Sequence, residues 1–348
     1  MTAASPWPRN AWYVACAANE LADKPLGRRI CGEPVVLYRG ADGAAAALED
    51  FCPHRGAPLS LGFLREGELV CGYHGLAVGC DGRPASMPGQ RVEAFPAVRV
   101  FPAAERGGFV WIWPGAADAA DAALLPDLTW ADSPDWAYGG GMFHIACDYR
   151  LMIDNLMDLT HETYVHAASI GQKEIDEAPV ETLIEGDEVI TRRFMHGIHA
   201  PPFWRAAMRG AGLDETALVD RWQICRFALP SHVMIEVGVA LAGNGGYDAP
   251  ADKKVYGVVT DFITPETETS HWYFWGMART FAVDDAALTE QIRAGQGKIF
   301  SEDLEMLERQ QQNLSRAPER RLLKLNIDAG GVHSRGKITR AIAAEAAA

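Results

Sequence analysis

The N-terminal third of the chain is a series of short apolar segments separated by turn residues. Residues 34–38 and 108–113 are mainly apolar and have the length of strands, and glycines interrupt the sequence between them at short intervals. Apolar runs of this length bounded by glycine predict strands joined by tight turns. We therefore expect residues 1–115 to form an all-β domain.

The pattern changes after this domain. Residues 114–141 are rich in alanine, aspartate, proline and glycine, which is typical of a linker leading into a second domain. A helix is expected to begin near Asp148 and to carry His161 and His166, and a long helix is expected over residues 285–314. Strand-like segments lie between the two helices, at residues 179–194, 218–227, 231–241, 255–264 and 270–281. The second domain is therefore expected to span residues 116–348 and to end in a helical or frayed tail.

Length, composition and charge restrict the class of protein. A chain of 348 residues, 48% hydrophobic and 22% charged, is typical of a globular protein with one large or two ordinary domains. It contains no run of 18 apolar residues, and its first residues lack the pattern of a secretory signal, so we expect a cytoplasmic protein. The net charge of −14, from 32 basic and 46 acidic residues, argues against binding to nucleic acid or to an anionic membrane.

Four residues of the first domain have the spacing of a metal site. Cys52 and His54 form a Cys-x-His pair, and after 16 intervening residues Cys71 and His74 form a Cys-x2-His pair. Two thiolates on one iron and two imidazoles on the other are the ligands of a Rieske [2Fe–2S] cluster. A structural zinc ion is the alternative, although zinc-finger spacing groups the two cysteines together and the two histidines together. The other five of the seven cysteines are expected to be buried small residues rather than disulfide partners.

A second set of candidate ligands lies near the start of the second domain. His161 and His166 are five residues apart, so on an ideal helix they point about 140° from each other. They can meet at one metal only if the helix ends or bulges between them. Asp154, Asp158 and His161 have the spacing of one polar stripe on this helix. A surface that faces water is the simpler interpretation of such a stripe, but two histidines beside two aspartates and Asn155 favour a metal site.

The third ligand of such a site is expected to be a carboxylate, because non-haem Fe(II) oxygenases bind iron through two histidines and one carboxylate. The long C-terminal helix offers Asp303, with Glu302 and two further glutamates nearby. Asp303 lies in the middle of an apolar stripe that includes Ile299, Phe300 and Leu307, whereas the glutamates lie outside it. An acid on a buried stripe is costly unless it is paired or bound to a metal. Asp303 is therefore the candidate ligand, and a salt-bridged buried acid is the alternative.

These motifs resemble those of the Rieske non-haem iron oxygenases. The resemblance is carried by residues 52–60 (Cys-Pro-His-Arg-Gly-Ala-Pro-Leu-Ser), 71–76 (Cys-Gly-Tyr-His-Gly-Leu) and 154–161 (Asp-Asn-Leu-Met-Asp-Leu-Thr-His). Weaker similarity extends over nearly the whole chain, from residues 10–14 to residues 322–326. The resemblance implies an α+β protein, in which a Rieske β domain precedes a helix-grip, START-like catalytic domain with an antiparallel sheet and a long C-terminal helix.

The resemblance also implies roles for individual residues. It assigns a [2Fe–2S] cluster and a mononuclear iron to two sets of ligands, namely Cys52, His54, Cys71 and His74 for the cluster and His161, His166 and Asp303 for the iron. It makes Asp158 a bridge, hydrogen-bonded between a cluster histidine of one subunit and an iron histidine of the next, and it places Asn155 beside the iron. Members of the family are trimers that close head to tail.

The function implied is that of an oxygenase component that uses dioxygen and electrons from NAD(P)H. A separate reductase with a flavin and a ferredoxin-type cluster is the expected partner, because this chain has no Gly-x-Gly-x-x-Gly dinucleotide motif. The implied reaction is O-demethylation of vanillate to protocatechuate with release of formaldehyde, and syringate, another methoxybenzoate, a dicamba-like acid or an aryl sulfonate are alternative substrates. Candidate substrate-binding residues are Asp261, His232, Arg205 and other basic residues of segment 193–209.

Two other classes of protein remain open on the sequence. A Rieske-type electron carrier explains the cluster motif but not the residues that follow the linker, and it would take up oxygen without forming a product. A zinc-stabilised ligand-binding protein explains the Cys/His set without redox chemistry, and it would be colourless.

Overall fold

The computed structural model describes residues 5–167 and 173–347. The chain forms two compact units: one comprises Met1–Leu128, Thr264–Thr267 and Ala341–Ala348, and the other comprises Thr129–Ile263 and Glu268–Arg340. The domain boundary expected at residue 115 stays a prediction. No helix in the described part of the chain is long and apolar enough to cross a membrane.

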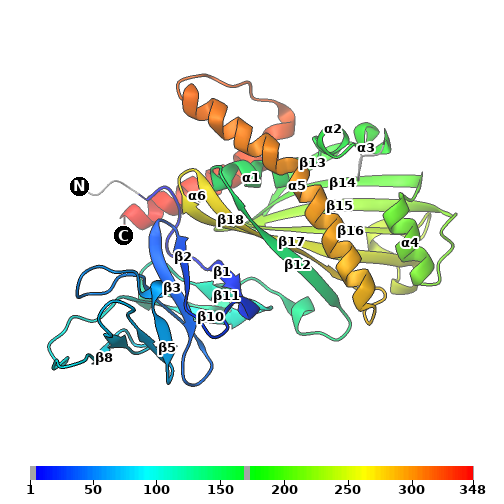
Figure 1. Ribbon diagram of the computed structural model, residues 1–348. Coiled ribbons are helices and arrows are strands. Elements are labelled where there is room, and N and C mark those ends of the chain that lie inside the picture. Colours follow the sequence, from blue (N-terminus) through cyan, green and yellow to red (C-terminus); the bar gives the residue numbers. More distant parts are fainter. Residues whose placement is uncertain (1–4, 168–172, 348) are drawn as a thin grey trace. The chain divides into compact units, whose positions relative to one another are not determined.

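The first unit is built from short antiparallel strands, as the sequence predicts (Figure 1). Its elements are β1 (Tyr13–Ala17), η1 (Ala18–Glu20), β2 (Leu26–Ile30), β3 (Glu33–Arg39), β4 (Ala45–Glu49), η2 (Leu59–Leu61), β5 (Phe63–Arg65), β6 (Glu68–Val70), β7 (Ala77–Val78), β8 (Pro84–Ser86), β9 (Val100–Phe101), β10 (Ala103–Arg106), β11 (Phe109–Ile112), η3 (Ala117–Ala119) and η4 (Ala122–Leu124). The strands form three sheets, ordered β1-β11-β10, β2-β3-β4-β9 and β5-β6-β7-β8. The expected strands at residues 34–38 and 108–113 are β3 and β11.

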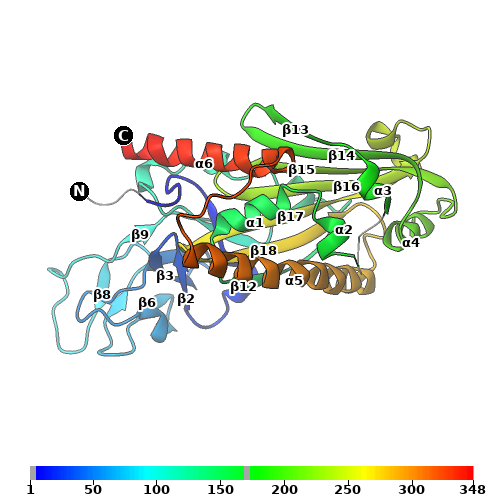
Figure 2. The same cartoon turned by 90° about the horizontal axis from the view of Figure 1, so that it is seen from above.

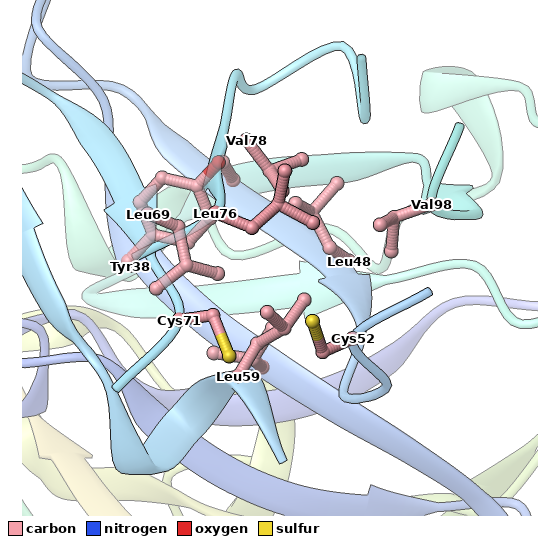
Figure 3. Packing of buried hydrophobic residues seen from close by; sticks show 11 residues of the cluster. Tyr38, Leu48, Cys52, Leu59, Leu69, Cys71, Leu76, Val78 and Val98 are labelled. Carbon is pink, nitrogen blue, oxygen red and sulfur yellow. The ribbon is translucent and has the colours of Figure 1, made fainter. Parts of the chain in front are cut away.

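One apolar cluster of this unit includes both motif cysteines. Buried side chains of β3 and β4 pack against Leu69 of β6 and Val78 of β7, and Cys52 and Cys71 belong to the same cluster. Figure 3 shows the two cysteine sulfurs close to Leu59, which starts the short helix η2 between the two motifs. The packing of the two sheets therefore fixes the positions of both cysteines.

The second unit contains a seven-stranded antiparallel sheet. Its elements are η5 (Thr129–Ala131), β12 (Ala137–Ile145), α1 (Tyr149–Leu156), α2 (Glu162–Val165), α3 (Lys173–Glu177), β13 (Val180–Glu185), β14 (Glu188–His199), α4 (Pro202–Gly210), β15 (Leu218–Ala228), β16 (His232–Leu241), η6 (Gly246–Asp248), η7 (Ala251–Lys253), β17 (Lys254–Thr267), β18 (Ser270–Arg279), α5 (Ala286–Arg316), η8 (Asn326–Asp328) and α6 (Ala329–Ala347). The strand order is β12-β18-β17-β16-β15-β14-β13. The last residues of β17 (264–267) and of α6 (341–347) belong to the first unit. The expected antiparallel sheet and long C-terminal helix are confirmed, and segment 179–194 is a hairpin formed by β13 and β14.

The prediction that residues 139–141 belong to a linker is wrong. These three glycines lie in β12 and pair with Trp275, Gly276 and Met277 of β18. A Cβ atom on Gly140 would come within 2.3 Å of the Trp275 carbonyl oxygen. Glycine is used here because the two backbones approach each other closely, rather than because the chain needs to bend.

The prediction that one helix carries both histidines is also wrong. The helix begins as expected, with the Asp148 side chain accepting a hydrogen bond from the Arg150 backbone N–H at 2.9 Å, but α1 ends at Leu156. Asp158 Oδ1 then accepts hydrogen bonds from the backbone N–H and the hydroxyl of Thr160, both at 2.7 Å. Side chain–backbone bonds of this kind compete with helical hydrogen bonds, which explains why the helix stops.

Helix α5 crosses one face of the sheet (Figures 1 and 2). It begins after Asp285, whose side chain accepts a hydrogen bond from the Leu288 N–H at 2.9 Å, and it contains no proline. Its buried residues are Ile292, Asp303 and Leu307, which lie on one stripe of the helix. Ile292 packs against apolar residues of the strands and of α4. The sequence prediction that Asp303 projects from the buried stripe is therefore confirmed.

Candidate metal centres

The two Cys–His motifs fold into loops with the same hydrogen-bond pattern. In the first loop, the Cys52 N–H donates to the Ala57 carbonyl at 2.9 Å and the Gly56 N–H donates to the Cys52 carbonyl at 2.8 Å. In the second loop, Cys71 pairs in the same way with Leu76 at 2.8 Å and with Gly75 at 3.0 Å. Each loop is thus a self-contained turn that presents one cysteine and one histidine.

Both loops depend on a glycine with positive φ. Gly56 has a φ of +69° and Gly75 a φ of +74°, a conformation that other residues rarely adopt. A Cβ on Gly56 would also lie 2.9 Å from the Phe51 ring, and one on Gly75 would lie 3.2 Å from Pro88. The glycines that the sequence places beside each Cys–His pair therefore close the turns.

The four side chains gather in a way that fits a Rieske cluster. Cys52 and Cys71 are buried, and the rings of His54 and His74 lie 4.5 Å apart, centroid to centroid. Burial raises the pKa of the Cys52 thiol and the neighbouring Cys71 raises it further, whereas the backbone N–H groups of His54 and Arg55 lower it. N–H groups directed at a sulfur are what a ligated thiolate needs. The two thiols therefore lie in the interior of the unit, and the two imidazoles lie nearer its surface.

The second constellation is formed by His161, His166 and Asp303. One ligand atom from each of the three lies within 4.8 Å of the other two. His166 Nε2 is 3.4 Å from Asp303 Oδ2, and His161 Nε2 is 3.7 Å from Asp303 Oδ1. Helix α2 is a single turn, with His161 before its first residue and His166 after its last, so both rings can turn toward α5. The structure therefore brings the three predicted residues together.

Two neighbours hold these side chains in place. Asn155 Nδ2 donates to Asp303 Oδ1 at 3.0 Å. Glu302 Oε2 lies 2.8 Å from His166 Nδ1, which leaves Nε2 of this ring facing Asp303. A carboxylate bonded to the far nitrogen of a histidine fixes the ring orientation and raises its basicity as a metal ligand.

The charges around His166 favour a cation. Burial opposes the charged form of this histidine, but the hydrogen bonds and charges of Asp303 and Glu302 outweigh burial and raise its pKa. The same negative field favours a metal cation at the point where the two Nε2 atoms and the Asp303 carboxylate converge. Two nitrogens and one carboxylate oxygen are the donor set of a non-haem iron site with open positions. The residues present therefore fit the iron that the resemblance implies.

A buried polar cluster supports the turn that carries the histidines. Gln223 Nε2 donates to Glu162 Oε1 at 2.8 Å, and Arg193 Nη2 lies 3.2 Å from the same oxygen. Arg193 Nη1 donates to the carbonyls of Leu159 at 2.9 Å and Ile175 at 3.2 Å. Arg193 is 2% exposed and Glu162 5% exposed, so both charges depend on these partners. The cluster ties α2 and its preceding loop to strands β14 and β15.

The candidate substrate-binding residues do not converge. Arg205 is exposed on α4, whereas Asp261 and His232 are buried. His232 pairs with Phe262 across β16 and β17, so it points to the face of the sheet opposite Asp261. Arg193, from the segment proposed to line the pocket, belongs to the polar cluster described above. Substrate binding by any of these residues stays a prediction.

Sequence reasoning missed three residues that act near the second site. Glu302 was set aside because it lies outside the buried stripe of α5, yet its side chain reaches His166. Gln223 could have been identified from the sequence, because it is a polar residue between Trp222 and Ile224 in a strand that is otherwise largely apolar. Tyr273, which donates to Asp261 Oδ1 at 2.6 Å, has no such signal in its aromatic-rich strand.

Two family models match the chain. Residues 11–102 match the Rieske [2Fe-2S] domain, and residues 145–344 match the vanillate O-demethylase oxygenase C-terminal domain. The first match covers both cluster loops and the second covers all three residues of the His/His/Asp set.

Individual relatives are similar over nearly the whole chain. It is 68% identical over 339 residues to the vanillate O-demethylase oxygenase subunit of Pseudomonas sp. strain HR199, an alignment that covers 97% of this chain and 96% of the relative. It is 71% identical over 319 residues to the subunit of the same description from Pseudomonas sp. strain ATCC 19151, with 92% and 97% covered. The crystal structure of dicamba monooxygenase bound to 3,6-dichlorosalicylic acid is 35% identical, with a TM-score of 0.89 and coverage of 98% and 99%.

Proposed function

Because this chain belongs to the Rieske oxygenase family of the vanillate O-demethylase oxygenase subunits, we propose that it is the oxygenase component of a vanillate O-demethylase. The reaction class rests on the convergence of His161, His166 and Asp303 in a chain that also carries a Rieske domain. The substrate rests on the extent of the similarity, which includes the whole catalytic unit.

We propose that Cys52, His54, Cys71 and His74 hold the [2Fe–2S] cluster and that His161, His166 and Asp303 hold the iron. When bound, the cluster supplies single electrons and the iron binds and activates dioxygen. Asn155 and Glu302 orient the ligands through the hydrogen bonds described above. Arg193, Gln223 and Glu162 keep the turn between the two histidines fixed.

The overall reaction balances as follows. Vanillate, dioxygen, two electrons and two protons give protocatechuate, formaldehyde and water. One oxygen atom enters a C–H bond of the methoxy group, and the resulting hemiacetal splits into the phenol and formaldehyde. The electrons come from NAD(P)H through a separate reductase, in keeping with the absence of a dinucleotide-binding motif in this chain.

The electron route is proposed to cross between subunits of a head-to-tail trimer. Asp158 then bridges a cluster histidine of one subunit and His161 of the next. In support, His161 Nδ1 is buried without a hydrogen-bond partner among the described residues, and Asp158 lies only three positions earlier in the chain. A buried imidazole nitrogen without a partner is costly. The carboxylate of Asp158 in the same chain fits that position, and its cluster-histidine partner would come from the neighbouring subunit.

The direct test of the proposed function is an assay of the purified protein with a vanillate-type reductase, NADH and a panel of methoxybenzoates. We expect vanillate to give one formaldehyde per dioxygen consumed, with 4-hydroxybenzoate, which has no methoxy group, as the control. Oxygen uptake without formaldehyde would favour an electron carrier, and a colourless protein would favour zinc. Release of formaldehyde from other methoxybenzoates but not from vanillate would reject the substrate and retain the reaction.

The route between subunits can be tested by mixing two inactive variants. His161→Ala removes a proposed iron ligand and Cys71→Ala a proposed cluster ligand, so each homotrimer should be inactive. Mixed trimers, obtained by co-expressing two differently tagged chains, should regain activity, because an intact cluster in one subunit then faces an intact iron site in the next. Isolated mixed trimers without activity would contradict the route.

A further inference from the structure

Asp261 is a wholly buried acid that the metal chemistry does not use. It lies in β17 with 0% of its surface exposed. Its Oδ1 accepts the hydroxyl of Tyr273 at 2.6 Å, whereas its Oδ2 is buried and has no hydrogen-bond partner in the described part of the chain. A buried polar oxygen without a partner is costly, so this one needs a partner that the described residues do not supply.

The strand pattern places Asp261 in the layer between the sheet and α5. Side chains two positions apart point to the same face of a strand, so Asp261 shares a face with Val259. Val259 belongs to the apolar cluster that includes Ile292 of α5. Asp261 therefore projects toward the helix that also carries Asp303.

A chain of contacts connects Asp261 to the candidate iron site. The Tyr273 ring packs edge-on against Phe300, with centroids 5.4 Å apart, and Phe300 lies three residues before Asp303 on α5. Burial, and then the charge of Asp303, raise the pKa of Asp261 to about 8, although the bond from Tyr273 lowers it. Asp261 and Asp303 thus line the same layer closely enough to sense each other's charge.

The chemistry of Oδ2 restricts what can bind there. Burying a second carboxylate in this apolar layer, close to the charge of Asp303, would be costly, so the acid group of an aromatic substrate is a poor partner for Oδ2. A phenolic hydroxyl is a neutral donor that can be buried at low cost once it is bonded. Of the three substituents of vanillate, only the hydroxyl has this character.

We propose that Asp261 Oδ2 accepts a hydrogen bond from the phenolic hydroxyl of the substrate, and that this bond makes the enzyme select hydroxylated methoxybenzoates over those without a hydroxyl. This inference rests on the proposed function. Tyr273 is the positioning residue, because its hydroxyl occupies Oδ1 and leaves Oδ2 for the substrate. A site that has to hydrogen-bond a hydroxyl discriminates strongly against an analogue that lacks it.

The test compares two substrates in the complete system. Vanillate and 3-methoxybenzoate share the carboxylate and the methoxy group and differ only in the hydroxyl. For the wild type we expect kcat/KM for formaldehyde release to be about 10- to 100-fold higher with vanillate, since a site built to hydrogen-bond a hydroxyl discriminates against an analogue that lacks it. Calorimetric Kd values for the two compounds, measured on the protein loaded with cluster and iron, should show the same preference.

Three variants then assign the preference to Asp261. Asp261→Leu should lose the preference, through a fall with vanillate and little change with 3-methoxybenzoate. Asp261→Asn keeps the size of the side chain and turns a donor toward the hydroxyl position, so it should lower the preference about tenfold, and it keeps the test valid if the leucine variant does not fold. Tyr273→Phe should lower the preference by a smaller factor, because Oδ2 stays in place but is less well oriented.

The outcomes separate the inference from the proposed function. If Asp261→Asn lowers activity equally with both substrates, or leaves the preference unchanged, Asp261 has a structural role and the inference is wrong. If the wild type uses both substrates equally well, the inference is wrong and the O-demethylase function stands. If the wild type releases no formaldehyde from either substrate, the proposed function fails, and the inference fails with it.

Discussion

In the first unit, each Cys–His pair lies within one short loop, and 16 residues separate the two pairs. In the second unit, His161 and His166 flank a one-turn helix, and Asp303 comes from a helix 137 residues further along the chain. The loops need only local hydrogen bonds and two glycines with positive φ. The second site needs the sheet, a buried polar cluster and the docking of α5. The comparison teaches that local sequence builds each cluster loop and sheet packing only brings the two loops together, whereas the second site depends on tertiary packing throughout.

The largest expected effect separates the two sites completely. His161→Ala should abolish mononuclear iron binding and turnover but keep the red cluster spectrum, because the cluster loops fold independently of α2. Cys71→Ala should do the reverse, with loss of the spectrum and retention of iron measured by metal analysis. Loss of the cluster spectrum in His161→Ala would mean that the two sets of ligands are assigned to the wrong metal sites.

Asp158 tests whether the two sites work together. Asp158→Asn should bind both metals and lose about 100-fold or more in turnover, since a bridging acceptor that becomes an amide no longer orients the histidines in the same way. Metal content and the cluster spectrum serve as the controls. Normal turnover of this variant would reject the bridge.

The buried polar cluster tests the dependence of the second site on packing. Arg193→Met leaves Glu162 buried without its cation, and losing one partner of such a pair costs about 3–5 kcal/mol. We expect a lower melting temperature and weaker iron retention, with an unchanged cluster spectrum. Arg192→Met is a matched control, because Arg192 is the neighbour of Arg193 in β14 and pairs with the exposed Glu181 of β13. Similar losses in the two variants would mean that the cluster has no special role.

Glu302 gives a smaller effect confined to one ligand. Glu302→Gln weakens the hold on His166 and should lower iron affinity about tenfold, at the lower end for such supporting residues. Glu305→Gln, at an exposed position of the same helix, is the control. Iron affinity that stays the same in both variants would show that Glu302 does not orient His166.

The smallest expected effect is a change in thermal stability with pH. The pKa of Asp261 is about 8 in the folded protein and near 4 in the unfolded chain, so the wild type loses stability as pH rises between these values. Asparagine does not ionise. The melting temperature of Asp261→Asn relative to wild type should therefore rise between pH 5 and pH 8, by about 2–4 °C for each kcal/mol of stability that the wild type loses. A constant difference would mean that Asp261 is ionised throughout.

The sequence by itself determined the cluster loops, the strand-rich first unit, the antiparallel sheet, α5 and the three residues of the second site. These features leave local signals: Cys–His spacing, glycines, short apolar runs and one acid in an apolar stripe. The sequence did not determine where α1 ends, because the hydrogen bonds that Thr160 donates to Asp158 compete with a helical pattern that continues in the sequence.

Only the tertiary structure decided how distant parts of the chain meet. It placed residues 139–141 in a strand, brought Glu302 to His166, and joined Arg193 and Gln223 to Glu162. It also separated Asp261 from His232, which lie on neighbouring strands but point to opposite faces of the sheet. These contacts depend on strand register and on the packing of α5 and α2. A residue type carries no record of its partner when that partner lies 60 to 140 positions away.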